Sequence, residues 1–204
     1  LGAEAAPDAS AARVEARWRW RGLTPLITGI RVVEPHLRVR LDNSGRVSAG
    51  ALERIRGRPT GQRPTTPRFA LELIDGEALI EAPFGALTAQ FHGAGELGRD
   101  FAAEATLAPA DLQSGDYALR QGAGALALTA REDGFEATLA LGAGALSWNG
   151  LIVNGAALNA EAQAPLDLSR FILVADWRAR EAANPALAAS GLTGAVSFET
   201  ALRE

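Results

Sequence analysis

The sequence predicts an all-β protein, a long and mostly antiparallel sheet that carries one or two short helices. Apolar and polar residues alternate in short segments such as 13–20 and 69–73, which places one set of side chains on each face of a pleated sheet. The pentapeptide Glu-Ala-Thr-Leu-Ala occurs at 104–108 and again at 136–140. A repeat of roughly thirty residues is typical of a stacked architecture rather than of an enzyme built around one cleft.

The composition favours one folded unit whose stability is spread over many strands. The chain has 204 residues, a length at which β folds often form a single domain. Hydrophobic residues reach 48%, but Ala and Gly inflate this share, and aromatic residues make up only 6%. Each strand therefore contributes a thin core, and we expect the strands to stabilise the sheet additively.

Charge and cysteine content exclude several classes of function. The formal net charge is -4, and all 20 cationic residues are Arg. This acidity argues against non-specific nucleic-acid binding, which needs a basic surface. The absence of Cys excludes disulfides, thiolate metal ligands and a Cys nucleophile together. The chain begins at Leu1 and shows no signal peptide or transmembrane pattern, so we expect a piece of a longer protein whose anchor or export signal lies upstream.

The N-terminal third predicts three strands. Residues 1–12 lack periodicity and are expected to fray or to cap the first strand. That strand is expected at 13–21, where apolar residues including Trp18 and Trp20 alternate with charged ones. A turn at 22–25, a break at Glu34-Pro35 and a turn at 42–45 then bound two further strands, 27–33 and 36–42.

Two segments are candidates for short helices. Ser48 can cap a helix over 48–56. Residues 180–189 contain Asn184-Pro185 and predict either a second short helix or a long crossover. The Pro-rich residues 57–67 predict an exposed loop, which is the candidate for an internal boundary of an otherwise single unit spanning 1–204.

From residue 69 onward, strands of about five to nine residues alternate with turn signals, as expected for a meander. The expected strands are 69–74, 77–81, 85–93, 102–107, 117–121, 125–131, 135–141, 144–148, 157–163, 171–178 and 192–202. The expected turns are Asp75-Gly76, Pro83, 98–100, 114–115, 132–134, Asn149-Gly150 and Asn154-Gly155. Two of these turns are Asn-Gly, a dipeptide strongly favoured in hairpins.

Residues 93–98 read Gly-Ala-Gly-Glu-Leu-Gly and match G-x-G-x-x-G, a pattern that binds dinucleotides where it joins a strand to a helix N-terminus. Residues 101–107 alternate as a strand, so no helix dipole is expected to receive a pyrophosphate. The Gly-Ala-Gly triplets at 122–124 and 142–144 are of the same kind. We interpret all three as glycine-rich strand ends, and we expect no cofactor.

Candidate catalytic side chains are few. His36 and His92 lie in separate predicted strands and lack the spacing of a metal site or a catalytic triad. Carboxylate pairs of the kind that glycosidases use occur at 75/77 and 132/133, but both fall in or beside expected turns, where solvated carboxylates are common. We therefore expect neither an enzyme nor a metal site.

The apolar face of the predicted sheet is the strongest candidate site. The tryptophans are either ordinary core or part of an apolar surface left open for a ligand. A long sheet with one apolar face and little helix to cover it closes, stacks on a second sheet or holds an apolar ligand. One shared face is expected to carry Trp18, Trp20, Leu37, Val39, Leu41, Phe69, Leu71, Leu73, Phe91, Phe101, Leu107, Leu128, Phe135, Leu139, Phe171, Leu173 and Trp177. The opposite face is expected to carry Arg17, Arg19, Arg38, Arg40, Glu72, Glu104 and Glu136.

The N-terminal third also resembles a known family. Residues 27–42 read Ile-Thr-Gly-Ile-Arg-Val-Val-Glu-Pro-His-Leu-Arg-Val-Arg-Leu-Asp, and residues 44–55 read Ser-Gly-Arg-Val-Ser-Ala-Gly-Ala-Leu-Glu-Arg-Ile. This order resembles the AsmA-like superfamily of Gram-negative envelope proteins, in particular its YdbH-type branch. A Pro-rich loop, the strand Phe-Ala-Leu-Glu-Leu at 69–73 and a later Gly-Ala-Leu segment continue the similarity to about residue 112.

The resemblance implies a U-shaped β-groove whose concave apolar face carries phospholipid acyl chains across the periplasm, without catalysis. The expected partners are then phospholipid acyl chains, the remaining segments of the same long chain, and an outer-membrane lipoprotein or other envelope protein; nucleic acid is not expected. The protein is expected to be anchored in the inner membrane by a segment outside this chain. The residues of the shared apolar face are the expected lining of the lipid groove.

Two other functions stay open at this point. In a structural or adhesive β-solenoid or sandwich, the same apolar face is sealed as a dry core. A carbohydrate-active enzyme rests only on the all-β class and is the weakest alternative.

Overall fold

The computed structural model describes residues 2–3, 6–42, 47–48, 69–83, 85–97, 99–165 and 170–201. Every regular element in these residues is a strand, which confirms the all-β fold class. The strands are β1 (Gly2–Ala3), β2 (Ala6–Pro7), β3 (Ala9–Arg21), β4 (Thr24–Leu41), β5 (Val47–Ser48), β6 (Ala70–Ala82), β7 (Gly85–Glu96), β8 (Ala102–Ser114), β9 (Tyr117–Ala130), β10 (Gly134–Trp148), β11 (Leu151–Pro165), β12 (Arg170–Ala183) and β13 (Ala188–Ala201).

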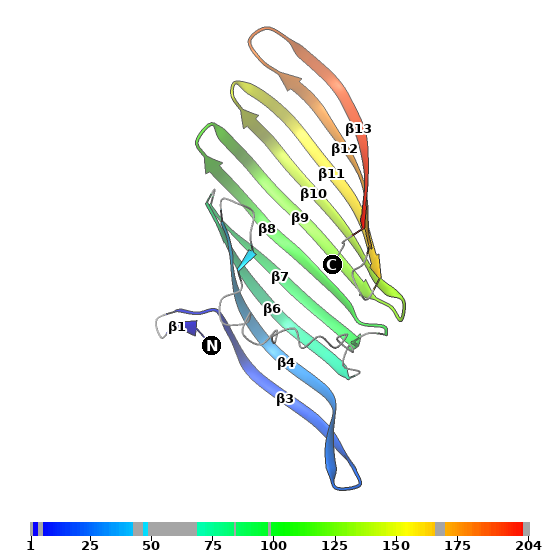
Figure 1. The fold of residues 1–204 in the computed structure, drawn as a ribbon. Helices are drawn as coiled ribbons and strands as arrows, with labels where there is room; N and C mark the ends of the chain where they lie inside the picture. The colour runs from blue at the N-terminus through cyan, green and yellow to red at the C-terminus, as the bar shows by residue number, and fades with distance from the viewer. Residues whose placement is uncertain are drawn as a thin grey trace.

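The strands from β3 to β13 form one 11-stranded sheet (Figure 1). Its order is β13-β12-β11-β10-β9-β8-β7-β6-β4-β3, with β5 paired to β4 beside this path, while β1 and β2 form a separate pair. Neighbouring strands in this sheet pair antiparallel, except that β4 and β6 are parallel. The sheet is therefore a long meander with one parallel step, and its antiparallel character is confirmed.

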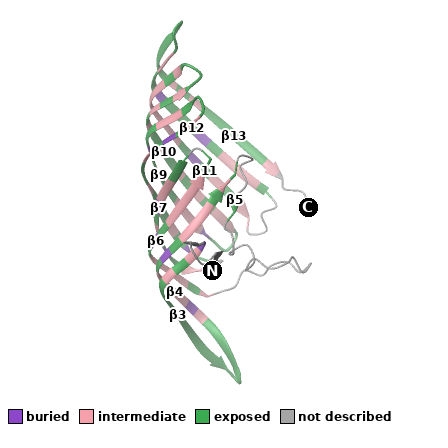
Figure 2. Ribbon diagram, turned by 90° about the vertical axis from the view of Figure 1, so that its left-hand side faces the viewer, coloured by how far each residue is buried: buried purple, intermediate pink, exposed green. Residues whose placement is uncertain are grey.

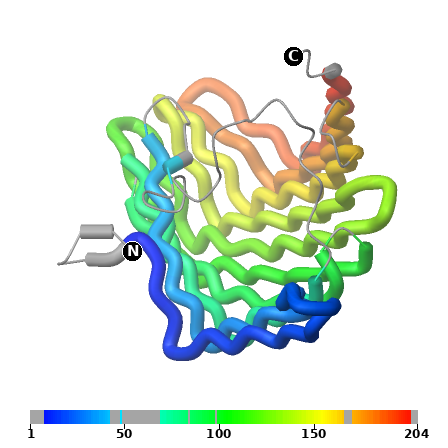
Figure 3. The backbone as a smooth tube through the Cα atoms, turned by 60° about the horizontal axis from the view of Figure 1, so that its bottom comes forward, coloured from blue at the N-terminus to red at the C-terminus, as the bar shows by residue number. Residues whose placement is uncertain are grey.

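The sheet is curved and does not close into a barrel, since β3 and β13 remain its two edges. Figure 3 shows the strands bending together, so that the sheet forms an open trough with hairpin turns along its rims. A long curved sheet is thus confirmed. Apart from the β1–β2 pair, every described strand belongs to this one sheet, so the described strands supply no opposing layer to seal an apolar face.

The cross-strand register assigns the strand residues to two faces, because residues directly opposite each other in a ladder point to the same side. We call the side that carries Leu139 the inner face. Its direct partners are Leu126 in β9 and Ala160 in β11, and the pairing continues in the same way toward both edges. The other side of the sheet is the outer face.

In β9 to β13 the alternation between the faces shifts by one residue at a single row. This row, which we call the crease, contains Gln121, Gly144, Gly155, Arg180 and Gly191. Gln121, Gly155 and Gly191 have φ of 51°, 62° and 66°. A residue in the left-handed backbone conformation bends a strand and changes the face to which the following side chains point, as in a β-bulge. The register carries this shift into β10, where the inner face changes from odd-numbered residues up to Ala143 to even-numbered residues from Leu146.

Three predicted breaks fall inside long strands and are wrong. Glu34-Pro35 lies within β4, Asp75-Gly76 within β6 and Asn154-Gly155 within β11. Glu34 and Asp75 have φ of 49° and 51°, and the ladder continues on both sides of each. The residues that accept positive φ bend the strand here instead of ending it. The strands predicted separately at 117–121 and 125–131 are joined in β9, which bends at Gln121, and those at 135–141 and 144–148 are joined in β10. The Gly-Ala-Gly triplets at 122–124 and 142–144 therefore lie inside strands, and their interpretation as strand ends is wrong.

The described residues contain no helix. Residues 180–189 are the end of β12, a short turn and the start of β13, so both predicted alternatives, a second short helix and a long crossover, are wrong. The Asn184 side-chain oxygen accepts the backbone N–H groups of Ala186 and Leu187 at 2.9 and 2.8 Å, which holds Pro185 in an Asx-type turn. Of the first predicted helix, Ser48 lies in β5, and residues 49–56 lie outside the described residues together with the Pro-rich loop 57–67.

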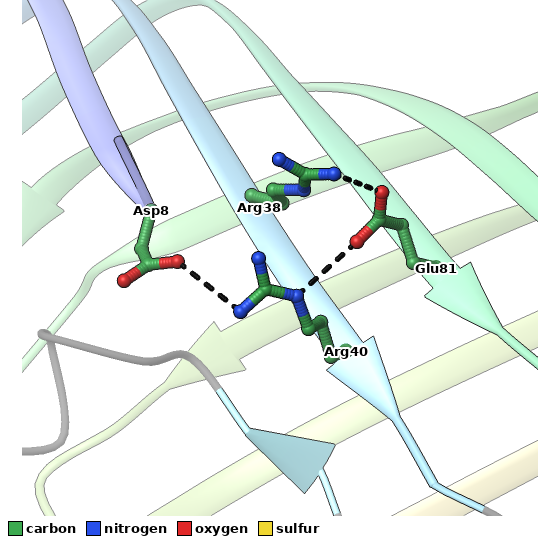
Figure 4. Close-up of polar contacts among 4 residues, drawn as sticks. All are labelled: Asp8, Arg38, Arg40 and Glu81. Carbon is green, nitrogen blue, oxygen red and sulfur yellow. Dashed lines mark hydrogen bonds and ion pairs between the residues drawn. The ribbon is translucent and has the colours of Figure 1, made fainter. Parts of the chain in front are cut away.

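The parallel step between β4 and β6 is held on the outer face by a network of charges (Figure 4). Arg38 donates a hydrogen bond to Glu81, and Arg40 Nε lies 3.3 Å from the second oxygen of the same carboxylate. Arg40 also reaches Asp8, with Nη1 3.7 Å from Oδ1. The hydrogen bond from Arg38, followed by the charge of Arg38 and by the contact with Arg40, lowers the pKa of Glu81. The outer face is therefore the side on which charges pair.

Candidate functional site: an uncharged trough

The inner face of the described strands carries no charged side chain outside the crease and the bends at Glu34 and Asp75. Ladder by ladder, its members are Ala, Val, Leu, Ile, Pro, Gly, Phe and Trp, with Ser114, Tyr117 and Thr200 as its polar members. An alternation this strict over ten strands separates an apolar surface from a polar one across the thickness of a single sheet.

The register places all the sequence-predicted lining residues on this one face. They are Trp18, Trp20, Leu37, Val39, Leu41, Leu71, Leu73, Phe91, Leu107, Leu128, Phe135, Leu139, Phe171, Leu173 and Trp177, with Phe69 and Phe101 in phase directly before β6 and β8. The predicted polar set, Arg17, Arg19, Arg38, Arg40, Glu72, Glu104 and Glu136, lies on the outer face. That the apolar residues line a lipid groove stays a prediction.

The inner face is largely uncovered by the described residues. No large side chain there is fully buried, and the buried apolar residues are mostly Ala, with Phe101 and Leu112 (Figure 2). Trp177 is 43% exposed, Phe198 52% and Val196 57%. Soluble proteins rarely leave a contiguous apolar surface open unless something binds it.

The trough is hollow where it crosses β7 to β13. A cavity of about 670 Å³ lies on the inner face there, between residues that include Leu107, Leu119, Leu141, Leu158 and Trp177. A second hollow of about 580 Å³ shares Leu112, Leu119, Leu146, Leu151 and Val153 with it. The two hollows are therefore one continuous depression of a size that suits a small apolar ligand.

Small side chains form the floor of this depression, and larger ones form its walls. Gly122, Ala143, Ala156 and Ala179 make one cross-strand row beside the crease. On one side of this row runs the series Leu119, Leu146 and Val153; on the other runs Leu141, Leu158 and Trp177. The resulting channel crosses the strands, and a flexible apolar chain can lie in it along the long axis of the sheet.

An aromatic pair closes one rim of the depression. Tyr117 at the start of β9 and Trp148 at the end of β10 are direct partners, and their rings stack with centroids 5.9 Å apart and planes at 11°. They are 58% and 50% exposed. Aromatic side chains with a polar group suit the boundary between an apolar surface and water. Trp148, weighed from the sequence as core or open surface, thus lies on the open face at its rim.

Several cavity residues were missed from the sequence. The strongest are Leu112, Leu119, Leu141, Leu158 and Leu192. The sequence pattern is sufficient to predict Leu141, because it lies two residues after Leu139 and therefore on the same face of the strand. Leu119, beyond the crease in β9, has the opposite parity to Leu128, and no alternation within one segment reveals that the two share a face.

The candidate catalytic groups lie on the outer face or in turns. His36, His92, Asp75 and Glu77 line one outer depression of about 420 Å³, so the structure brings the two histidines closer than the sequence indicates. His92 Nε2 lies 3.7 Å from a Glu104 carboxylate oxygen, and both side chains are exposed. The described residues hold no group of three His, Cys, Asp or Glu placed to bind a metal ion.

The G-x-G-x-x-G segment ends β7 and has a steric explanation. Gly95 has φ of 133°, and a Cβ there would lie 2.5 Å from the Asp100 carbonyl oxygen and 2.6 Å from the Phe101 Cα. The chain then turns, with the Asp100 carboxylate accepting the Glu96 N–H at 2.7 Å, and enters β8. The glycines therefore allow two strands to approach closely, and no helix follows them.

Asp111 anchors the crease from the outer face. Its Oδ1 accepts the backbone N–H of Gln121 at 2.8 Å, and its Oδ2 accepts a hydrogen bond from Arg120 at 3.1 Å. Gln121 is the non-glycine residue with positive φ in this row. The hydrogen bond from the Gln121 backbone, followed by that from Arg120, lowers the pKa of the Asp111 carboxyl.

This lowered pKa predicts a pH-dependent contribution to stability. Asp111 stabilises the folded state fully above the pKa of an unfolded Asp, about 4, and loses that contribution as the pH falls through the lower folded pKa. We expect Asp111→Asn to flatten the loss of the urea midpoint between about pH 5 and pH 2. Urea unfolding followed by circular dichroism at several pH values checks this, with Asp116→Asn in the adjacent turn as the control. Parallel pH profiles of wild type and Asp111→Asn would contradict the anchoring role.

In comparisons with models of protein families, with curated proteins and with solved structures, the chain matched none. The described residues include no helix long and apolar enough to cross a membrane. The resemblance to the AsmA-like superfamily therefore stays an expectation, while the described residues form a trough whose inner face they leave largely uncovered and uncharged.

Proposed function

We propose that this chain is a segment of a non-enzymatic conduit for phospholipid acyl chains. One observation carries the proposal: a channel floored by Gly122, Ala143, Ala156 and Ala179 and walled by larger apolar side chains runs across the strands of an open sheet. A ligand held there meets hydrocarbon on its floor and both walls. The removal of apolar surface from water drives such binding, at about 25 cal/mol for each Å².

The direction of the channel favours a long chain over a compact ligand. Its rows follow the ladder from strand to strand, and each step adds about 4.8 Å. The floor row is elongated, because it crosses four strands from Gly122 in β9 to Ala179 in β12 before Leu192 of β13 ends it. A methylene chain fits such a path because it is unbranched and uncharged, and a phospholipid headgroup can stay in water at the open side.

The cellular role in the proposal follows the resemblance. An AsmA-like, YdbH-type protein would span the periplasm from an anchor in the inner membrane, and this chain would supply one part of its groove. Transport would serve the lipid balance of the outer membrane, together with the remaining segments of the chain and an envelope partner such as an outer-membrane lipoprotein. No catalytic step is part of this proposal.

A sealed structural sheet is the competing function, and the exposure of Trp177, Val196 and Phe198 weighs against it. The two are separated by mass spectrometry of organic extracts from the purified chain. The conduit predicts phospholipid co-extracted in a reproducible molar ratio after the protein is washed in detergent-free buffer. Extracts without phospholipid, from protein that is folded by circular dichroism, would overturn the proposal and favour the sealed sheet.

A further inference from the structure

The hairpin formed by β3 and β4 projects beyond the rest of the sheet. β4 pairs with β6 only from Gly29 onward, so among the described residues the preceding part of β4 pairs with β3 alone (Figure 1). We call residues 17–28 the hairpin tip. A two-stranded hairpin without further strands is only marginally stable in water. Packing within the hairpin tip therefore does not explain which side chains it exposes.

The hairpin tip concentrates exposed apolar side chains. Leu23, in its turn, is 98% exposed, Trp20 67%, Trp18 63% and Ile27 50%. Gly22 has φ of 64°, and in such turns the second position usually carries a polar residue. Leu at this position adds nothing to the fold, because it projects into solvent at the end of the molecule.

The opposite face of the tip carries unpaired positive charge. Arg17, Arg19 and Arg21 lie on the outer face, and residues 17–28 contain no Asp or Glu. Most arginines elsewhere on this face pair with carboxylates, as Arg31 does with Glu72 and Arg38 with Glu81. Arg17, Arg19 and Arg21 form no ion pair with any described residue. The chain as a whole is acidic, with a net charge of -4, so this cationic tip is a local exception.

We infer that the hairpin tip docks on an anionic lipid bilayer. Leu23 and Trp20 enter the interfacial layer, where Trp is favoured, and Arg19 and Arg21 contact lipid phosphates. The combination selects a membrane over a protein partner, since an apolar end with cations along one face complements hydrocarbon beneath a layer of negative headgroups. The inference rests on the tip alone and holds whether or not the trough carries lipid.

The other described hairpin ends lack this combination. The β8–β9 turn contains Gly115 and Asp116, and the β10–β11 turn contains Asn149 and Gly150. Leu187, in the β12–β13 turn, is 70% exposed but has no arginine beside it. It therefore provides a matched control for Leu23 on a different hairpin.

The experiment is flotation of the purified 204-residue chain with vesicles of phosphatidylcholine alone or mixed with phosphatidylglycerol. We expect wild type to float with the anionic vesicles, less so at high salt. Leu23→Asp should lower this binding at least about tenfold and Leu187→Asp should leave it unchanged, while circular dichroism verifies the fold of both. Arg19→Glu combined with Arg21→Glu should lower it at least about tenfold as well.

Four outcomes overturn the inference. The wild-type protein does not float, or it binds neutral and anionic vesicles equally. Alternatively, Leu23→Asp and Leu187→Asp lose vesicle binding equally, or the protein self-associates without vesicles and Leu23→Asp abolishes this self-association. The last of these would assign the tip to a second copy of the chain. Flotation by the hairpin tip and co-extraction of phospholipid from the trough are separate measurements, so either can fail without the other.

Discussion

Replacing Leu141 by Asp is expected to lower the amount of phospholipid co-extracted with the protein at least about tenfold. An unpaired carboxylate against a methylene chain costs several kcal/mol, and each 1.4 kcal/mol changes the binding constant about tenfold. Leu141 forms part of one wall of the cavity and lies beside Ala143 of its floor. The measurement is the molar ratio of phospholipid to protein in organic extracts, determined by mass spectrometry.

The matched control is Ala140→Asp. Ala140 is the residue before Leu141 in β10, and its side chain lies on the outer face, opposite Asn159. The same carboxylate is then added one position away, on the other side of the sheet. We expect Ala140→Asp to retain the wild-type ratio. A similar loss in both variants would contradict a lipid path confined to the inner face.

A second variant separates loss of lipid from loss of fold. Ala143→Phe fills the floor of the channel without adding charge, and it is expected to exclude lipid as Leu141→Asp does. Because the inner face is open, water reaches an Asp at position 141. The midpoint of thermal unfolding of the Leu141→Asp variant should therefore fall only slightly below that of wild type. In a sealed core the same carboxylate would cost several kcal/mol of folding free energy, and a collapse of the midpoint would favour the structural alternative.

The sequence predicts the faces of the sheet well because alternation is a local signal. Within the segment 135–141, Phe135 and Leu139 share a phase with each other and oppose Glu136, and the same rule applies in every predicted strand. Most predicted strands also end near a bend of the sheet. The alternation of apolar and polar residues within each of them is therefore not interrupted by the bend. This explains why Trp18 in β3 and Trp177 in β12 were assigned to one face.

The trough itself is beyond such local reasoning. The row from Gly122 to Ala179 joins residues of four strands, and it exists only because the register aligns them. Register depends on pairing across the whole sheet, which alternation in one strand does not specify. The bends were also misinterpreted, since Asp75-Gly76 and Asn154-Gly155 have the composition of turns but continue their ladders. The projection of the hairpin tip depends in turn on where β6 begins.

Replacing Gly95 by Ala is expected to lower the free energy of unfolding by about 3 kcal/mol. A φ of 133° belongs to a region that side chains other than Gly adopt at a cost of about 1–3 kcal/mol. The added Cβ also meets backbone atoms of residues 100 and 101 within 2.6 Å, and overpacking costs about 1–3 kcal/mol more. For a chain of this size the midpoint of thermal unfolding should fall by roughly 6–12 °C.

Gly142→Ala is the control, because Gly142 belongs to a Gly-Ala-Gly triplet of the same sequence, yet a Cβ added to it would meet no other atom within 4 Å. Gly inside a strand costs conformational entropy relative to Ala, so this substitution should be neutral or stabilise the protein by up to about 1 kcal/mol. The two triplets would then be alike in sequence and opposite in consequence. Equal midpoints for Gly95→Ala and Gly142→Ala would show that the close approach of β7 and β8 is not what requires glycine, and the G-x-G-x-x-G segment would need another explanation.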